Sequence, residues 1–123
     1  MSLQGAVAAV VARLETVSVD GQAVRVFTDP QDVSPPCLFL PPPSADFMFD
    51  KHGAKATWEL FVVAPTAGGN SPAFDVIYAM TDALVALGLP LASMENYQLT
   101  LPSGVIAPAI RVTWPERNIR IGA

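Results

Sequence analysis

The most constraining feature of this sequence is an interruption, bounded by prolines, between two apolar runs that resemble β-strands. The first run, Cys37–Leu40, ends at Pro41–Pro43, and the second extends from Thr57 to Ala64. Proline has no backbone N–H to donate to a β-ladder, so the three prolines end the first strand. A long segment without regular structure is uncommon in a small domain unless it is functional or disordered. The sequence therefore predicts an extended arm over residues 41–56.

The tip of this arm carries three large apolar side chains, Phe47, Met48 and Phe49. Apolar side chains at a loop tip have no evident role inside their own domain, and they match a segment that docks on a partner. We expect Phe47, Met48 and Phe49 to be anchors at a subunit interface, together with Pro42 and Pro43 at the start of the arm.

The composition also indicates association with other protein chains. The 123 residues suffice for one domain, 1–123, that buries roughly two thirds of its unfolded surface and needs no disulfide or metal. Only 15% of the residues are charged, against about 25% in an average domain, and 51% are hydrophobic. The shortage of charge predicts an obligate oligomer, and the alternative is a monomer with a surface rich in alanine and proline.

Charge and cysteine content exclude several classes of protein. The net charge is −4 and no basic cluster exists, which argues against tight DNA binding. The apolar N-terminal stretch has no Lys or Arg before it and is closed by Arg13 and Glu15, so neither export nor membrane insertion is predicted. Cys37 is the only cysteine, which fits a reducing cytoplasm.

Periodicity predicts helices at two places. The first runs from a cap at Ser2 to Glu15, with an apolar stripe of Leu3, Val7, Val10, Val11 and Leu14. The second begins with Ser71 as N-cap and ends at Gly88. The expected buried face of this second helix consists of Phe74, Ile77, Tyr78, Thr81, Leu84 and Val85.

The remaining segments read as strands. Asp20–Gly21 predicts a turn before a strand at Val24–Phe27. The run from Thr57 to Ala64 places one apolar set on each face, Trp58, Leu60 and Val62 against Phe61 and Val63. This pattern predicts a central strand covered by a helix on one face, with a neighbouring subunit as a candidate cover for the other.

The last third of the chain reads as a hairpin with a turn at Ser103–Gly104, followed by a tail over residues 115–123. The predicted fold class is α+β. We expect two helices packed on one face of a mainly antiparallel or mixed sheet of four to five strands, with a long hairpin arm.

Residues that could carry catalysis are few. His52, the only histidine, lies in a turn-like segment, and Cys37 lies within an apolar strand where a thiol packs as a small hydrophobe. Gly68–Gly69 precede a helix but lack the sequence pattern of a phosphate-binding loop. Glu59 is a candidate for one half of a general acid and base pair, but a single carboxylate on the exposed face of a strand is also ordinary without any catalytic role. We therefore expect no enzyme, no metal and no cofactor.

The chain resembles the tail terminator (tail completion) proteins of long-tailed bacteriophages. The order of elements carries the likeness, together with Asp29–Pro30, Pro35–Pro43, Trp58–Ala64 and the segment Ala-Leu-Val-Ala-Leu-Gly that ends at Gly88. The resemblance implies a virion protein of the tail neck, assembled in the host bacterial cytoplasm. Its implied form is a ring, expected to be a homohexamer, that caps the tail tube, stops its polymerisation and joins it to the head-side connector.

In such a ring the viral DNA passes through the lumen without tight binding, and the implied partners are other copies of the chain, the tail tube protein and the connector. We expect Asp46 and Asp50 to line this DNA channel, because like charge prevents adhesion of DNA. Three alternatives remain open: a head-completion or tail tube protein of the same kind of virion, a cytoplasmic protein-binding adaptor, and a small hydrolase.

Overall fold

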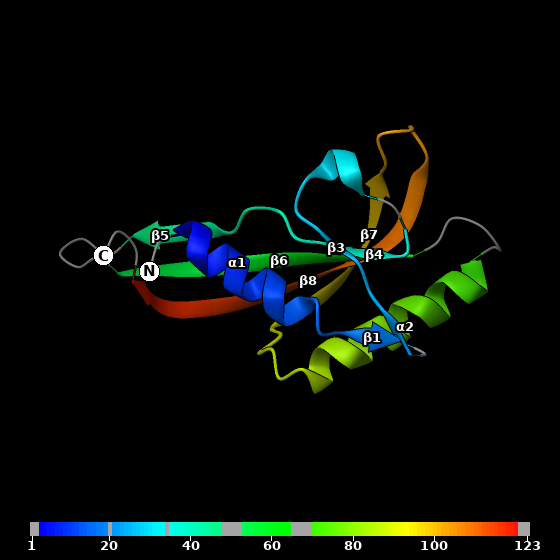
Figure 1. The fold of residues 1–123 in the computed structure, drawn as a ribbon. Coiled ribbons are helices and arrows are strands. Elements are labelled where there is room, and N and C mark those ends of the chain that lie inside the picture. The colour runs from blue at the N-terminus through cyan, green and yellow to red at the C-terminus, as the bar shows by residue number, and fades with distance from the viewer. Residues whose placement is uncertain (1–2, 20, 34, 48–52, 65–69, 121–123) are drawn as a thin grey trace.

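The described part of the chain folds into two α-helices, a short 3-10 helix, a two-stranded sheet (β1-β2) and a larger mixed sheet, shown as a computed structural model in Figure 1. The structure describes residues 3–19, 21–33, 35–47, 53–64 and 70–120. The helices are α1 (Leu3–Leu14), the short 3-10 helix η1 (Pro30–Asp32) and α2 (Asn70–Ala86). The strands are β1 (Ser18–Val19), β2 (Gln22–Ala23), β3 (Val26–Phe27), β4 (Cys37–Phe39), β5 (Ser44–Phe47), β6 (Gly53–Val63), β7 (Ser93–Thr100) and β8 (Ile106–Arg120).

The main sheet has the strand order β3-β4-β6-β8-β7, and β5 also pairs with β6. Only β3 and β4 run parallel, and all the other neighbours are antiparallel. The predicted α+β class with a mixed sheet is confirmed. The sheet has six strands, because a segment expected within the arm forms β5.

Both helices pack on the same face of the sheet, as Figure 1 shows. Trp58, Leu60 and Val62 of β6 are fully buried on this face, as their alternation predicts. Trp58 stacks on Trp114 of β8 with ring centroids 6.3 Å apart. The helical residues buried in the same cluster are Ala6, Leu14, Ile77, Met80 and Leu84.

The opposite face of the sheet holds a second, smaller apolar cluster. Phe61 and Val63 of β6 pack there with Cys37 and Phe39 of β4, and Val33 after η1 belongs to the same cluster. Phe61 is 7% exposed and Val63 is fully buried within the single chain. The expectation that a neighbouring subunit covers this face is therefore wrong for these two residues, because β4, β8 and Val33 of the same chain belong to their cluster and Phe61 also lies against the ring of Tyr97.

The arm is a continuation of the sheet. β4 and β5 pair with the same edge of β6, at its two ends. Leu40–Pro43 stand opposite Trp58–Leu60, so the proline segment carries one residue more than the strand that it faces. Prolines are tolerated at such a bulge on an edge, where no ladder hydrogen bond is lost. β6 consequently begins at Gly53, four residues before the predicted start at Thr57.

The C-terminal segment also forms part of a strand that was not predicted there. Residues 115–120 were expected to begin a tail without regular structure, but they extend β8, which pairs with β6 as far as Gly53↔Arg120. The arm is thus three-stranded. It consists of β5, the Gly53–Thr57 part of β6 and the Pro115–Arg120 part of β8. In Figure 1, α1 lies alongside this part of the sheet.

The buried face of α2 also differs from its prediction. Ile77, Met80 and Leu84 are buried, whereas Phe74, Tyr78 and Val85 are 44%, 58% and 60% exposed. The helix carries two apolar rows, and periodicity alone could not select the row that meets the sheet. The predicted stop is confirmed, because Gly88 adopts φ +89° and Arg13 of α1 donates to the nearby Leu87 carbonyl.

The two predicted turns are present. Gly21, at φ +78°, lies in the turn that joins β1 and β2, and Gly104, at φ +87°, lies between β7 and β8. The strand expected over Val24–Phe27 is shorter than predicted and covers Val26–Phe27 only.

Candidate assembly surfaces

Three of the five residues predicted to form a subunit interface lie in the part of the chain that the structure describes. Pro42 is exposed and Pro43 half-buried on the segment between β4 and β5. Phe47 is the last residue of β5, where its backbone pairs with Ala54. Met48 and Phe49 lie outside the described residues. The three predicted anchors thus remain an expectation, and the described part of the arm forms an edge of the sheet.

The predicted DNA-channel residues fall in the same region. Asp46 is exposed on β5 and stands directly opposite Lys55 of β6 in the strand register, while Asp50 lies outside the described residues. A lysine across the ladder offsets the charge of Asp46, so the described part of the arm is not a uniformly acidic surface.

The opposite margin of the sheet is formed by β7, which sequence reasoning did not identify as a functional element. Every residue of this eight-residue strand except Leu99 is exposed. Met94 is 58% and Tyr97 41% exposed. Within the described chain β7 pairs only with β8, so its outer edge presents backbone N–H and C=O groups without a strand partner. A long open edge of this kind is a template for pairing with another chain.

A polar cluster fixes β7 to the sheet. The Arg111 guanidinium of β8 contacts Glu95 of β7 at 2.7 Å and Glu59 of β6 at 3.2 Å. It also lies 5.9 Å above the ring of Tyr97, which in turn is 4.9 Å from the ring of Phe61. The hydrogen bond and charge of Glu95, with a smaller contribution from Glu59, raise the pKa of Arg111 above its usual value.

This cluster brings together residues that the sequence offered only separately. Glu59 was considered as half of an acid and base pair, and the structure does place a second carboxylate, Glu95, near it. A permanently charged guanidinium lies between the two carboxylates and forms an ion pair with each of them. The geometry is that of a cross-strand clamp, in which one guanidinium on β8 links carboxylates on β7 and β6.

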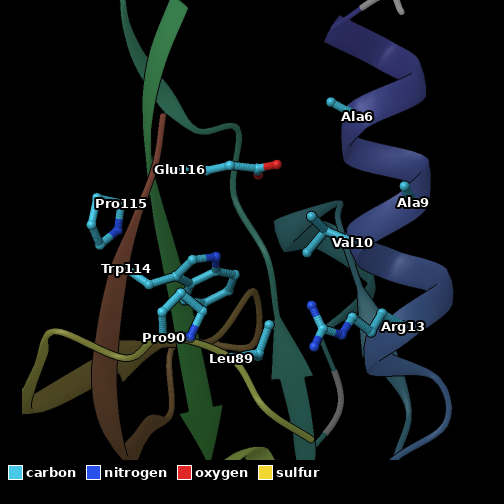
Figure 2. A pocket seen from close by; sticks show the side chains of 9 residues that line it. All are labelled: Ala6, Ala9, Val10, Arg13, Leu89, Pro90, Trp114, Pro115 and Glu116. Carbon is cyan, nitrogen blue, oxygen red and sulfur yellow. The ribbon is translucent and has the colours of Figure 1, made fainter. Parts of the chain in front are cut away.

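A groove separates α1 from β8 and is shown in Figure 2. Its volume is about 350 Å³. The lining residues are Ala6, Ala9, Val10 and Arg13 of α1, Leu89 and Pro90 after α2, and Trp114, Pro115 and Glu116 of β8. The small side chains of Ala6 and Ala9 leave the space open. Both alanines are visible in the sequence, but no groove was predicted from them.

The two charged residues of the groove already have hydrogen-bond partners. Arg13 Nη2 donates to the Leu87 carbonyl at 2.9 Å, and Glu116 Oε2 accepts from Trp58 Nε1 at 2.9 Å. Their charges lie at opposite ends of a mostly apolar wall in Figure 2. Between these two ends the groove is lined by Ala6, Val10, Leu89 and Trp114, so its wall there is apolar.

The residues considered for catalysis give no active site among the described residues. Cys37 is fully buried on β4, and His52 lies outside the described segments. No group of three or more His, Cys, Asp or Glu side chains in the described chain is placed to hold a metal ion. None of the helices that the structure describes has the length and apolar character to cross a bilayer.

No protein-family model matches the chain, and no significant match was found among curated proteins or solved structures.

Proposed function

We propose that this chain is a structural virion protein of a long-tailed bacteriophage, a tail terminator that assembles into a ring of six copies. The ring caps the tail tube, stops its polymerisation and joins the tube to the head-side connector. The observation that carries the proposal is that the sheet has open strand edges on both sides, β7 at one margin and β3 and β5 on the other side. Of the latter two, β5 is the longer edge and the one that the proposal uses. The family resemblance of the sequence supplies the biological setting.

Two open edges on opposite margins favour assembly from head to tail. When β7 of one copy adds to the β5 edge of the next copy, each subunit uses two different surfaces, which is a heterologous contact. Such contacts close into a ring when the rotation between neighbours permits closure. The prolines immediately before β5, Pro41–Pro43, limit how far a neighbouring strand can pair along this edge, and this favours one register.

The composition supports a covered surface and a neutral or acidic lumen. With 15% charged residues and a net charge of −4, the chain lacks the cations that grip DNA phosphates. Contacts with two neighbouring copies, with the tube and with the connector would cover apolar surface, which accounts for the shortage of charge. Asp46 and Asp50 remain our proposed residues of the DNA path.

The proposed role is mechanical and involves no catalytic turnover. Full burial keeps the Cys37 thiol away from any substrate in the folded chain. The clearest carboxylate pair, Glu59 and Glu95, is held by Arg111 in a structural clamp.

The test is electron microscopy of tubes polymerised from tail tube protein with and without this chain in excess. The proposal expects shorter tubes, each with an additional ring at one end. Tubes of unchanged length without terminal density would contradict it.

A second candidate, a cytoplasmic adaptor that binds one protein, is favoured by the groove between α1 and β8. An adaptor would remain a monomer or dimer when tubes are present. Native mass spectrometry of the capped tubes after gentle dissociation distinguishes the two, because only the ring proposal expects a closed oligomer.

A further inference from the structure

We infer that the outward face of α2 is a docking surface for a basic amphipathic helix of another protein. The surface is defined by Phe74, Tyr78, Thr81 and Val85, and is called the α2 stripe below. The inference does not depend on the ring proposal, which uses the strand edges.

The α2 stripe is apolar without serving the core of its own chain. Phe74, Tyr78 and Val85 are 44%, 58% and 60% exposed, and they include the two most exposed large hydrophobic side chains of this helix. The core contact of α2 is made by Ile77, Met80 and Leu84, all buried. At 3.6 residues per turn the stripe lies roughly 90° around the helix axis from this buried row. In Figure 1, β1 crosses α2, and the residues of α2 that line the space beside the β1–β2 segment are Val76 and Met80, which lie outside the stripe.

The spacing of the stripe indicates a helical partner. Its four residues follow one another at intervals of four, three and four, which is the spacing of the contact seam between two packed helices. Thr81, near the middle, is small, and its hydroxyl already donates to the Ile77 carbonyl at 2.8 Å. A partner helix can therefore approach the middle of the seam closely without leaving this hydroxyl unsatisfied.

The charge beside the stripe indicates that the partner is basic. Asp75 and Asp82 are exposed and lie seven residues apart, so they stand one above the other along the solvent side of the stripe. Neither forms an ion pair within the described residues. α2 contains no Lys or Arg. A helix with Lys or Arg beside its apolar row would complement this border, as charges beside a coiled-coil seam do.

The same charges argue against a second copy of α2 as the occupant. Two copies packed stripe to stripe and antiparallel would bring Asp75 of one next to Asp82 of the other. In a parallel pair the aspartates would face the core-side border of the partner helix, which holds Ile77 and Leu84. Neither orientation offers a cation, so self-association through this face is disfavoured.

The test is selection from a displayed library of random 16-residue peptides against the full-length chain at low salt. We expect enriched peptides with apolar residues at spacings of three and four, flanked by Lys or Arg. Affinities of two such peptides are then measured by fluorescence anisotropy against four forms of the protein. Replacing the anchors, Tyr78→Ser with Val85→Ser, is expected to weaken binding at least tenfold.

The charge and control variants complete the test. Asp75→Asn with Asp82→Asn keeps the side-chain shape and should weaken binding by about three- to tenfold, with a reduced salt dependence. The control, Val105→Ser with Ile106→Ser, removes exposed apolar groups elsewhere and should bind like the unmodified chain. Acidic or neutral enriched peptides, a failure to enrich any, or equal affinity for the α2 variants would overturn the inference. Sedimentation analysis supplies the last arm, because self-association that disappears with Tyr78→Ser and Val85→Ser would assign the face to a second copy instead.

Discussion

β6 and β7 flank the same strand, β8, yet they differ in almost everything else. In β6 the residues Leu60–Val63 are buried, with apolar clusters on both faces of the sheet. In β7 every residue but Leu99 is exposed, and one edge lacks a strand partner within the described chain. The interior strand is held by packing, whereas the margin strand is held by its ladder to β8 and by the Arg111 clamp.

This difference distinguishes the residues that stabilise the single chain from the residues that are available for contacts with other chains. Substitutions in β6 should lower the stability of the single chain, because they remove buried contacts. Substitutions on β7 should leave the single chain stable and change only its association with other chains. A β6 substitution that leaves stability unchanged, or a β7 substitution that lowers it, would contradict this distinction between the two strands.

The largest effect is expected for Trp58→Ala in β6. Trp58 is fully buried, stacks on Trp114 and donates to Glu116, so truncation leaves a cavity and removes a hydrogen bond. We expect the free energy of unfolding to fall by about 3–5 kcal/mol, measured by urea denaturation. Trp58→Phe keeps the stacking and should lose about 1–2 kcal/mol. A loss below 1 kcal/mol for Trp58→Ala would mean that β6 is not the centre of the core.

A smaller loss is expected for Cys37→Ser on β4, the neighbour of β6. The substitution places a hydroxyl in the second apolar cluster, and we expect a loss of about 1–3 kcal/mol in the free energy of unfolding. Combined with His52→Ala, it should still permit joining of tails to heads in an infectivity assay. A folded double variant that is unable to join tails would overturn the mechanical role.

In β7, Met94→Lys tests whether the outer edge of the strand pairs with another chain. A lysine on an edge strand discourages the pairing of a second strand. We expect association to weaken at least tenfold, which is about 1.4 kcal/mol, while the unfolding free energy changes by less than about 0.5 kcal/mol. The matched control is Val105→Lys, at a similarly exposed residue in the turn beyond the strand. Equal effects of the two lysines on association would show that β7 has no special role.

The Arg111 clamp should contribute no pH dependence to the free energy of unfolding in the neutral range. The pKa of Arg111 is raised in the folded chain, so its stabilising charge is fully present below the unfolded pKa and is lost only as pH rises through the folded pKa. Both values lie far above neutrality, so this arginine makes stability neither rise nor fall between pH 6 and pH 9. Thermal melts of the unmodified chain and of Arg111→Gln should therefore differ by a constant amount across this range.

The smallest effect on the fold is expected for Asp46→Lys. It places two lysines opposite each other at the register pair with Lys55, and the exposed site should limit the loss to about 0.5 kcal/mol or less. In phage, the same change combined with Asp50→Lys is expected to slow DNA passage while assembly continues. Normal infectivity of that double variant would remove both residues from the DNA path.

The sequence predicted those elements that side-chain burial determines. Trp58, Leu60 and Val62 alternate with Phe61 and Val63, and both sets are buried as expected. The strand starting at Gly53 and the end of β8 were missed, because these segments contain alanine, glycine, proline and charged residues with little strand preference. They are strands because long neighbours pair with them, and such pairing is a non-local property.

The surfaces were less predictable than the core. The apolar row of α2 that meets the sheet could not be chosen from periodicity, since Phe74 and Tyr78 fit a helical stripe as well as Ile77 and Leu84 do. Glu59, Glu95 and Arg111 were visible only as scattered charges, and strand register alone brings them into contact. The apolar pattern marked β6 as an interior strand, but nothing in the sequence of the last hairpin indicated that β7 lies at the margin of the sheet.

The central claim, that β7 is an unfinished edge completed by a neighbouring copy, is tested most directly by hydrogen exchange on the free chain and on the chain assembled on tubes. In the free chain the outward amides of β7 should exchange rapidly and those of β6 slowly, because only the latter are paired and buried. On assembly we expect exchange in β7 to slow at least tenfold while β6 is unchanged. Identical exchange of β7 in the free and assembled chain would contradict the account.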